Sequence, residues 1–207
     1  MTKVKICGLR RPEDIQIVNR LSPDYIGFVF APSRRQVLPE QAKKLRASLH
    51  PSICAVGVFV NSAPEDVAEI AIQCQLAAVQ LHGGEDAVMI KRLRTLLPSG
   101  CEIWKAAHVR TVADIQAVEV CGADKLLLDA FSAKAAGGTG HQFDWTLLNE
   151  YRPHLSFFLA GGLNPENASK AVRLVKPFGV DVSSGVEVDG FKDEQKVRRF
   201  IRAVKNV

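Results

Sequence analysis

The sequence has no apolar run of about 18 residues, the length that a membrane-spanning helix needs. Its beginning lacks the basic and then apolar pattern of a secretion signal. Its five cysteines form no CxxC pair or Cys/His cluster and are widely spaced at Cys7, Cys54, Cys74, Cys101 and Cys121. This pattern argues against a disulfide framework and against a zinc site. Together these absences predict a cytoplasmic protein with reduced thiols, no membrane partner and no metal.

Charge of one sign is not concentrated anywhere in the chain. The formal net charge is +5, and lysine and arginine are scattered among aspartate and glutamate. A nucleic-acid surface usually needs a basic stripe, so no nucleic-acid partner is predicted. No GxGxxG follows the first apolar run, so the usual dinucleotide fingerprint is missing. No low-complexity linker divides the 207 residues, and we expect a single domain over residues 1–207.

What the chain does contain is a short apolar run followed by a helical pattern, repeated eight times. The predicted strands are Val4–Cys7, Tyr25–Phe30, Ile53–Val60, Ala77–Leu81, Glu102–Ala107, Lys125–Asp129, Ser156–Ala160 and Val180–Ser183. The predicted helices are Pro12–Leu21, Pro39–Leu49, Ala63–Cys74, Asp86–Leu97, Val112–Val120, Trp145–Tyr151, Pro165–Val175 and Asp193–Val204. The repeat predicts a (β/α)8 TIM barrel of eight parallel strands, with its site at the C-terminal strand ends. An open doubly wound sheet is the alternative.

Groups suited to chemistry follow nearly every predicted strand. They are Cys7-Gly8, Ser33-Arg34-Arg35, Asn61, His82-Gly83-Gly84, His108, Asp129, Gly161-Gly162 and Ser183-Ser184-Gly185. The opposite strand ends show no such concentration. Because a barrel builds its active site from the C-terminal strand ends, the pattern indicates an enzyme.

Small residues after the last two strands suit an anion. They are Gly161, Gly162, Ser183, Ser184 and Gly185, and they lie where many barrels bind phosphate through backbone N–H groups. Either motif alone is also explained by a tight turn, but both together favour a phosphate site. A further glycine run that includes Gly138 and Gly140 is a candidate flap over the same phosphate.

The alternation of side chains along a strand predicts where Cys7 points. Val4 and Ile6 should face the helices, so Lys5 and Cys7 face the barrel interior. By the same count Asp181 points inward beside Lys5, and we expect an ion pair between them. A nearby ammonium favours a thiolate. An inert packing thiol is the alternative.

Three further side chains are candidates for the site. Asp129 ends a buried apolar run and suits a general acid or base, or else caps a loop. Of Arg34 and Arg35, one suits a second substrate anion, because guanidinium pairs with carboxylate in a bidentate way. His82 lines the cavity or is structural. From the residues alone we expect cofactor-free acid–base chemistry on a small phosphosugar held between Cys7 and Asp129.

The chain carries, in this order, the motifs KICG, GFVFAPSRR, VGVFVN, VQLHG, GGTGHQFDW, AGGLNPEN and VDVSSGVE. In order and spacing they resemble the phosphoribosylanthranilate isomerase family of tryptophan biosynthesis, from about Lys3 to the C-terminal helix. The resemblance implies a (β/α)8 barrel that needs no cofactor. It also implies the substrate N-(5-phosphoribosyl)anthranilate and the product 1-(2-carboxyphenylamino)-1-deoxyribulose 5-phosphate.

The resemblance further implies a role for each site residue. Asp129 is the general acid that opens the ribose ring, and Cys7 is the general base that removes the C2 proton. Arg35 holds the anthranilate carboxylate, and the five small residues named above hold the phosphate. The sequence departs from the family pattern at His141-Gln142, where many relatives have a lysine and a small polar residue.

Two other functions remain open at this point. One is a different aldose–ketose isomerisation on the same fold, such as the analogous step of the histidine pathway. That family uses two carboxylates, whereas here the first strand ends in Cys7. A phosphosugar-binding barrel without catalysis would be expected to lack Cys7 or Asp129, and both are present. Barrel isomerases occur as monomers and homodimers, and the sequence does not choose between these states.

Overall fold

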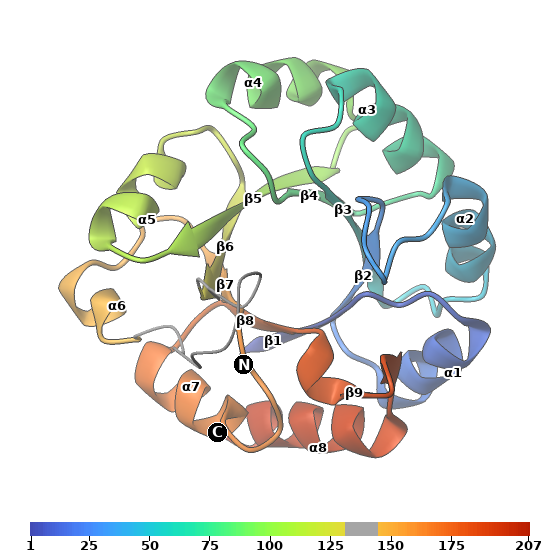
Figure 1. Cartoon of the computed structure of the whole chain (residues 1–207), viewed down its shortest axis with the longest axis vertical. Coiled ribbons are helices and arrows are strands. Elements are labelled where there is room, and N and C mark those ends of the chain that lie inside the picture. The colour runs from blue at the N-terminus through green and yellow to red at the C-terminus, as the bar shows by residue number, and fades with distance from the viewer. Residues whose placement is uncertain (131–144) are drawn as a thin grey trace.

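The computed structural model describes residues 1–130 and 145–207. Its strands form a closed barrel in the order β1 to β8, and the helices form a ring around it (Figure 1). The strands are β1 (Lys3–Cys7), β2 (Tyr25–Val29), β3 (Cys54–Phe59), β4 (Ala78–Leu81), β5 (Glu102–Val109), β6 (Lys125–Ala130), β7 (Phe157–Leu159) and β8 (Gly179–Val182). The helices are α1 (Pro12–Leu21), α2 (Pro39–Ala47), α3 (Pro64–Gln73), α4 (Ala87–Leu96), α5 (Val112–Glu119), α6 (Leu147–Glu150), α7 (Ala168–Val175) and α8 (Glu194–Lys205).

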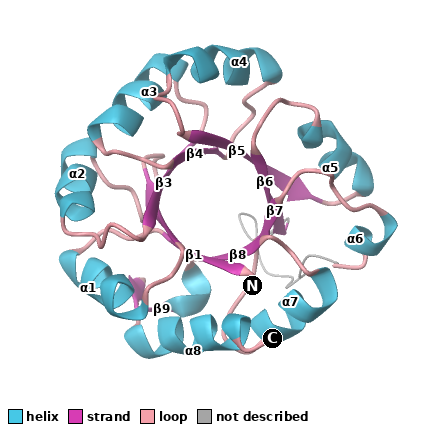
Figure 2. Ribbon diagram, turned by 180° about the vertical axis from the view of Figure 1, so that it is seen from behind, coloured by secondary structure: helices cyan, strands magenta, loops and turns pink. Residues whose placement is uncertain are grey.

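Every neighbouring pair of barrel strands is parallel, including the pair of β1 and β8 that closes the ring. The predicted (β/α)8 barrel is therefore confirmed, and the open doubly wound sheet is wrong. Seen from behind, the same closed ring of strands lies inside the helices (Figure 2). None of the helices in the described part of the chain is long and apolar enough to cross a membrane.

The predicted element bounds differ from the structure mainly at α7. This helix begins at Ala168 rather than at Pro165. The side chain of Asn164 accepts hydrogen bonds from the backbone N–H groups of Glu166 and Asn167, at 2.9 and 3.0 Å. These bonds hold the preceding residues in a turn, since an asparagine side chain competes with helical backbone bonding.

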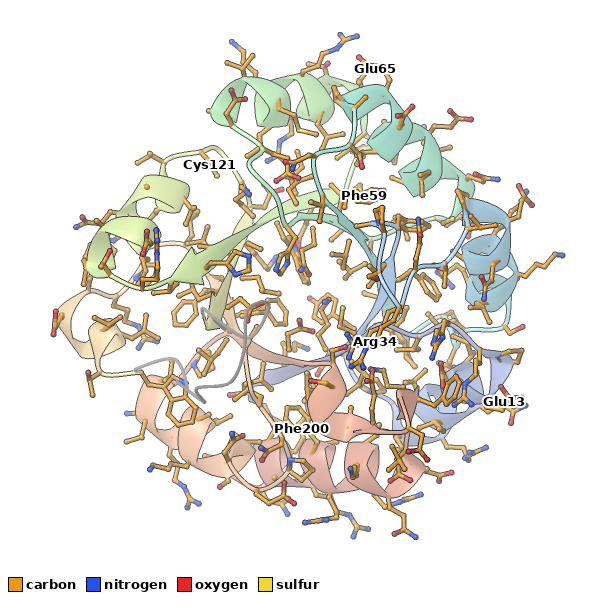
Figure 3. The ribbon with its side chains drawn as sticks, in the orientation of Figure 1. Glu13, Arg34, Phe59, Glu65, Cys121 and Phe200 are labelled. Carbon is orange, nitrogen blue, oxygen red and sulfur yellow. The ribbon has the colours of Figure 1, made fainter. Side chains whose placement is uncertain are left out.

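The two faces of β1 pack as their alternation predicts. Val4 and Ile6 are fully buried in the large apolar cluster that includes residues of the surrounding helices, such as Ile15 and Phe200. Figure 3 shows Phe200 on α8, while Glu13 and Glu65 lie at the outer rim. The hydrophobic effect thus fixes the outward face of the strand, which leaves Lys5 and Cys7 for the interior.

Aromatic side chains fill the part of the interior near the N-terminal ends of the strands. The Trp104 and Phe158 rings stack with centroids 4.6 Å apart, and Tyr25 meets Trp104 edge-on at 5.2 Å. Trp104 and Phe158 are fully buried. Side chains therefore fill this end of the barrel interior, while the polar candidates lie at the carboxyl ends of the strands.

A small hairpin that the sequence analysis did not predict lies between β8 and α8. A short 3-10 helix, Ser184–Val186, leads into β9 (Glu187–Val188), which pairs with β10 (Phe191–Lys192). The turn residues Asp189 and Gly190 have φ values of 50° and 79°. An Asp-Gly pair at positive φ is typical of a tight hairpin turn. The hairpin matters because it carries Glu187 and Lys192 to the site.

Candidate active site

Cys7 is the last residue of β1 and lies at the carboxyl end of the barrel. It is 8% exposed, and Lys5 below it is fully buried. The Lys5 Nζ donates to Asp181 Oδ1 at 3.0 Å, and β1 and β8 pair with Lys5 opposite Asp181. The predicted ion pair is confirmed. Gly27 of β2 lies so close that a Cβ there would come within 2.7 Å of the Cys7 sulfur.

The protonation of Cys7 depends on competing effects of burial and charge. Burial raises the pKa of the Cys7 thiol, and the Asp181 carboxylate also raises it. The Lys5 and Lys192 ammonium groups act in the opposite direction but do not outweigh burial. Burial also acts to lower the pKa of Lys5, yet the charges of Asp181 and Cys7 outweigh it and raise that pKa, so Lys5 stays charged. At neutral pH Cys7 is therefore mainly a thiol that has a cation beside it.

Replacement of Lys5 and replacement of Asp181 should shift the pKa of Cys7 in opposite directions. Lys5→Met removes a charge that lowers the pKa of Cys7, so the rise of its alkylation rate with pH should shift to higher pH. Asp181→Asn removes a charge that raises this pKa, so the rise should shift to lower pH. A shift of one pKa unit changes the thiolate fraction at pH 7 about tenfold.

This prediction is measured by iodoacetamide labelling of the Cys7 peptide across pH, with mass spectrometry separating it from the other cysteines. Thermal melts show whether each variant is folded. If both variants shifted the pH profile of Cys7 alkylation equally and in the same direction, the effects assigned to Lys5 and Asp181 on the pKa of Cys7 would be wrong.

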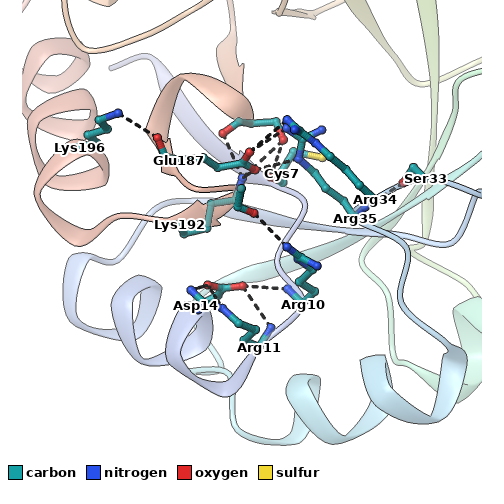
Figure 4. A network of polar contacts seen from close by, with 12 residues as sticks. Cys7, Arg10, Arg11, Asp14, Ser33, Arg34, Arg35, Glu187, Lys192 and Lys196 are labelled. Atoms are coloured by element: carbon teal, nitrogen blue, oxygen red, sulfur yellow. Dashed lines mark hydrogen bonds and ion pairs between the residues drawn. The ribbon is translucent and has the colours of Figure 1, made fainter.

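Arg35 lies over the turn after β1 and is held by an acidic residue of the hairpin. Its Nε and Nη2 donate to the two carboxylate oxygens of Glu187, each at 2.8 Å. Lys192 Nζ contacts the same carboxylate at 2.8 Å, and Arg34 reaches it at 3.6 Å. Figure 4 shows these cations around Glu187 beside Cys7. Burial would raise the pKa of Glu187, but Arg35 and Lys192 lower it to about 2.

The bidentate pair fixes the Arg35 guanidinium above Gly8. A Cβ on Gly8, whose φ is 83°, would come within 2.5 Å of Arg35 Cδ. Gly8 therefore meets both a backbone and a packing requirement for glycine. Arg35 Nη1 donates no hydrogen bond to any of the described residues, so it is available to a substrate anion.

Asp129 lies near the end of β6 beside two imidazoles. His82 Nε2 is 3.4 Å from Asp129 Oδ2, and the rings of His82 and His108 have centroids 5.2 Å apart. His82 Nδ1 lies 3.0 Å from Gln80 Nε2. The side chains of His82 and Asp129 are 22% and 25% exposed, so both are accessible at the barrel mouth. Ligand atoms of His82, His108 and Asp129 lie within 4.8 Å of one another, which makes this group able to hold a metal ion.

The predicted phosphate residues lie in two adjoining turns. Gly161 and Gly162 have φ values of 83° and 68°, and a Cβ on Gly162 would meet none of the described residues within 4 Å. Gly185 packs directly on the Leu163 carbonyl oxygen, so a side chain at this position would overlap it. Ser184 is exposed at the start of the 3-10 helix. The predicted flap residues Gly138 and Gly140 lie outside the described residues.

The Ser183 side chain connects two strand ends beside the site. Its hydroxyl donates to the Cys7 carbonyl oxygen at 3.0 Å, and Lys192 Nζ contacts the Ser183 carbonyl oxygen at 3.0 Å. The hydroxyl therefore links the end of β8 to the end of β1 and holds the backbone of the cysteine in place.

A second buried ion pair supports the loops after β3 and β4. Lys105 Nζ contacts Glu85 Oε2 at 3.0 Å and the Gly83 carbonyl oxygen at 2.7 Å. The Glu85 carboxylate also accepts the N–H groups of Asn61 and Gly83, each at 2.8 Å. Burial would raise the pKa of Glu85, but the backbone N–H groups of Asn61 and of Glu85 itself, together with Lys105, lower it. The network holds the loop that begins at His82.

Removal of one member of this pair should destabilise the fold strongly. Lys105→Met leaves the Glu85 carboxylate buried without its cation, and we expect a loss of about 3–5 kcal/mol in the free energy of unfolding. The exposed pair of Arg92 and Glu65, at 3.1 Å with both side chains 57% exposed, is the matched control. Arg92→Met should change stability by less than about 1 kcal/mol. Urea denaturation measures both, and equal losses would contradict the prediction.

Sequence reasoning missed several residues of the site, chiefly Glu187, Lys192, Glu85 and Lys105. The Asp-Gly pair at positions 189–190, flanked by Val188 and Phe191, was the available signal for the hairpin. Side-chain alternation along the strand places Gln80 on the same face as His82, two residues later. No local pattern marks Glu85 or Lys105, since their pairing joins the loop after β4 to a residue of β5.

Comparisons with known proteins agree with this geometry. Residues 4–203 match the family model of N-(5'-phosphoribosyl)anthranilate (PRA) isomerase. The N-(5'-phosphoribosyl)anthranilate isomerase of Acetivibrio thermocellus is 49% identical over 99% of this chain and 96% of its own. The crystal structure of phosphoribosylanthranilate isomerase from Thermotoga maritima is 38% identical, with a TM-score of 0.90 over the whole of both chains.

Two further solved structures bear on ligand and assembly. An isomerase in complex with reduced 1-(o-carboxyphenylamino)-1-deoxyribulose 5-phosphate is 37% identical over all of both chains, with a TM-score of 0.87. Monomers generated from the dimeric Thermotoga maritima isomerase are 38% identical over all of both chains, with a TM-score of 0.86. The family match spans nearly the whole barrel, including every described site residue named above. The chain belongs to the phosphoribosylanthranilate isomerase family.

Proposed function

We propose that the chain converts N-(5-phosphoribosyl)anthranilate to 1-(2-carboxyphenylamino)-1-deoxyribulose 5-phosphate, an Amadori rearrangement in tryptophan biosynthesis. The observation that carries the proposal is the placement of Cys7, above the buried Lys5–Asp181 pair, at the open end of a barrel of this family. The carboxylate of Asp129 lies at the end of β6 and supplies the second proton-transfer group.

The reaction needs one group that gives a proton and one that takes a proton. Asp129 protonates the ribose ring oxygen, and the ring opens to a Schiff base. Cys7 then removes the C2 proton, and the resulting enolamine becomes the ketone. Lys5 stabilises the thiolate form of Cys7 by its charge.

Binding uses the anionic ends of the substrate. Arg35, fixed by Glu187, presents Nη1 to the anthranilate carboxylate, and His82 lines the space between it and Asp129. Backbone N–H groups at Gly161, Gly162, Ser183, Ser184 and Gly185 hold the phosphate. Gly138 and Gly140 are proposed to cover it. Asp181 and Ser183 act as positioning residues, through Lys5 and through the Cys7 carbonyl.

The proposal extends to location and assembly. A biosynthetic enzyme of this family works in the cytoplasm without a membrane or nucleic-acid partner, as a monomer or homodimer. Light scattering of the purified chain distinguishes the two assembly states.

Turnover of freshly made phosphoribosylanthranilate tests the function. Loss of anthranilate-type fluorescence on addition of the purified chain is the expected result. If the chain binds the reduced product analogue without any turnover, it is a binding protein and the proposal fails. If it isomerises other aldose phosphates but not this one, its substrate is different.

A further inference from the structure

The ends of three consecutive strands bring two imidazoles and a carboxylate together. His82 follows β4, His108 lies in β5, and Asp129 lies in β6. His108 and Asp129 are directly paired in the register of β5 and β6, so their side chains leave the sheet on the same side. Their ligand atoms and that of His82 lie within 4.8 Å of one another.

This donor set suits a divalent transition metal. Catalytic zinc sites use three protein ligands of this kind and leave a fourth position open. Two histidines with one carboxylate also bind other first-row metals. Donors about 2.1 Å from a tetrahedral ion lie about 3.4 Å apart. His82 Nε2 and Asp129 Oδ2 are already 3.4 Å apart, and the exposed His108 needs only a small side-chain movement.

Gln80 provides the outer contact that a ligating histidine needs. It is 1% exposed, its Nε2 lies 3.0 Å from His82 Nδ1, and its Oε1 is buried with no hydrogen-bond partner among the described residues. No bond at Oε1 to these residues therefore opposes a half-turn of the amide, which exchanges its O and N positions. With Oε1 toward the ring, His82 donates from Nδ1 and its Nε2 lone pair faces Asp129. Such outer bonds orient metal-bound histidines.

We propose that His82, His108 and Asp129 form a Zn²⁺ site that inhibits the enzyme. A bound ion occupies the oxygen atoms with which Asp129 would deliver its proton, and it fills the mouth between β4 and β6. The inhibition rests on the proposed function, whereas the binding does not.

Calorimetric titration of chelator-treated protein with ZnCl₂, without substrate, tests the binding. We expect about one ion per chain, and His108→Ala should weaken binding by about 100-fold or more, because even the loss of an outer partner costs 10–100-fold. Gln80→Leu should weaken it by about 10–100-fold. His154→Ala, an exposed histidine remote in sequence and on another loop, is the matched control and should bind as the wild type does.

The half-buried thiols of Cys54 and Cys121 are the competing zinc ligands. Co²⁺ used in place of Zn²⁺ distinguishes them, because thiolate ligation adds a sulfur-to-metal charge-transfer band. Wild-type protein with Co²⁺ should lack this band. Its presence, or undiminished Zn²⁺ affinity in His108→Ala, would overturn the site.

Activity measurements then separate the site from the function. Each variant's rate with Zn²⁺ is divided by its own rate with chelator. The wild type should lose activity with Zn²⁺, and His108→Ala should lose much less. If inhibition is equal in the two proteins, the ion acts elsewhere and the inhibitory role is wrong. If the chain shows no turnover under any condition, the proposed function fails while calorimetry still decides the metal site.

Discussion

Replacement of Cys7 by alanine is expected to lower kcat for phosphoribosylanthranilate by about 10²–10⁴-fold, the usual contribution of a general base. The thiol sits at the end of β1, with Lys5 beneath it and Gly27 close against its sulfur. Among the described residues, no other cysteine shares these surroundings. Cys7→Ser should be almost as impaired, because a hydroxyl is far harder to deprotonate than a thiol.

The control for Cys7 is the half-buried Cys54 at the start of β3. Cys54→Ala should retain the wild-type rate. KM and the affinity for the reduced product analogue should change little in Cys7→Ala, since the base acts on the transition state rather than on substrate binding. Unchanged kcat in Cys7→Ala would show that another group removes the C2 proton and that Cys7 only packs.

Asp129→Asn should also lower kcat by about 10²–10⁴-fold. Asparagine keeps the size of the side chain and its contact with His82, but it cannot deliver a proton to the ring oxygen. The loss should appear in kcat and in kcat/KM alike, as for an interaction made only in the transition state. Steady-state kinetics by fluorescence measures both constants.

Asp124, just before the first residue of β6, is the matched control for Asp129. It binds Arg94 at 2.6 Å and accepts the Ile103 N–H at 2.7 Å, at the opposite end of the barrel. Asp124→Asn should lower the melting temperature while leaving kcat near the wild-type value. An equal loss of kcat in the two variants would mean that Asp129 acts through stability and not as an acid.

Much of the barrel could be predicted because its signals are local. Alternation in Val4–Cys7 separates an outward face from an inward one, and apolar burial fixes which is which. The same side-chain alternation predicted the ion pair of Lys5 and Asp181, whose strands are far apart in the sequence. That prediction worked because β1 and β8 close the ring in a register that places the two residues opposite each other.

The partners of Arg35 could not be predicted in the same way. Glu187 reaches it from a hairpin that follows β8, and Lys192 of the same hairpin contacts the same carboxylate. The bond between Arg35 and Glu187 joins segments far apart in the sequence and depends on the closed barrel. The Asp-Gly pair predicts a turn at this point, but nothing in the local sequence indicates which residues the hairpin contacts. Gly138 and Gly140 remain predictions.

The sequence by itself determined the periodic strands and helices, the end of the barrel that carries chemistry, and the inward direction of Cys7. Only the tertiary structure decided which strand ends meet, as His82, His108 and Asp129 do, and which cations surround Glu187. It also decided the protonation of Cys7. The sequence indicated the effect of Lys5 correctly, but burial raises the pKa of the thiol by more than Lys5 lowers it. The reason is physical: side-chain alternation is set by neighbours along the chain, whereas desolvation and charge pairing are set by neighbours in space.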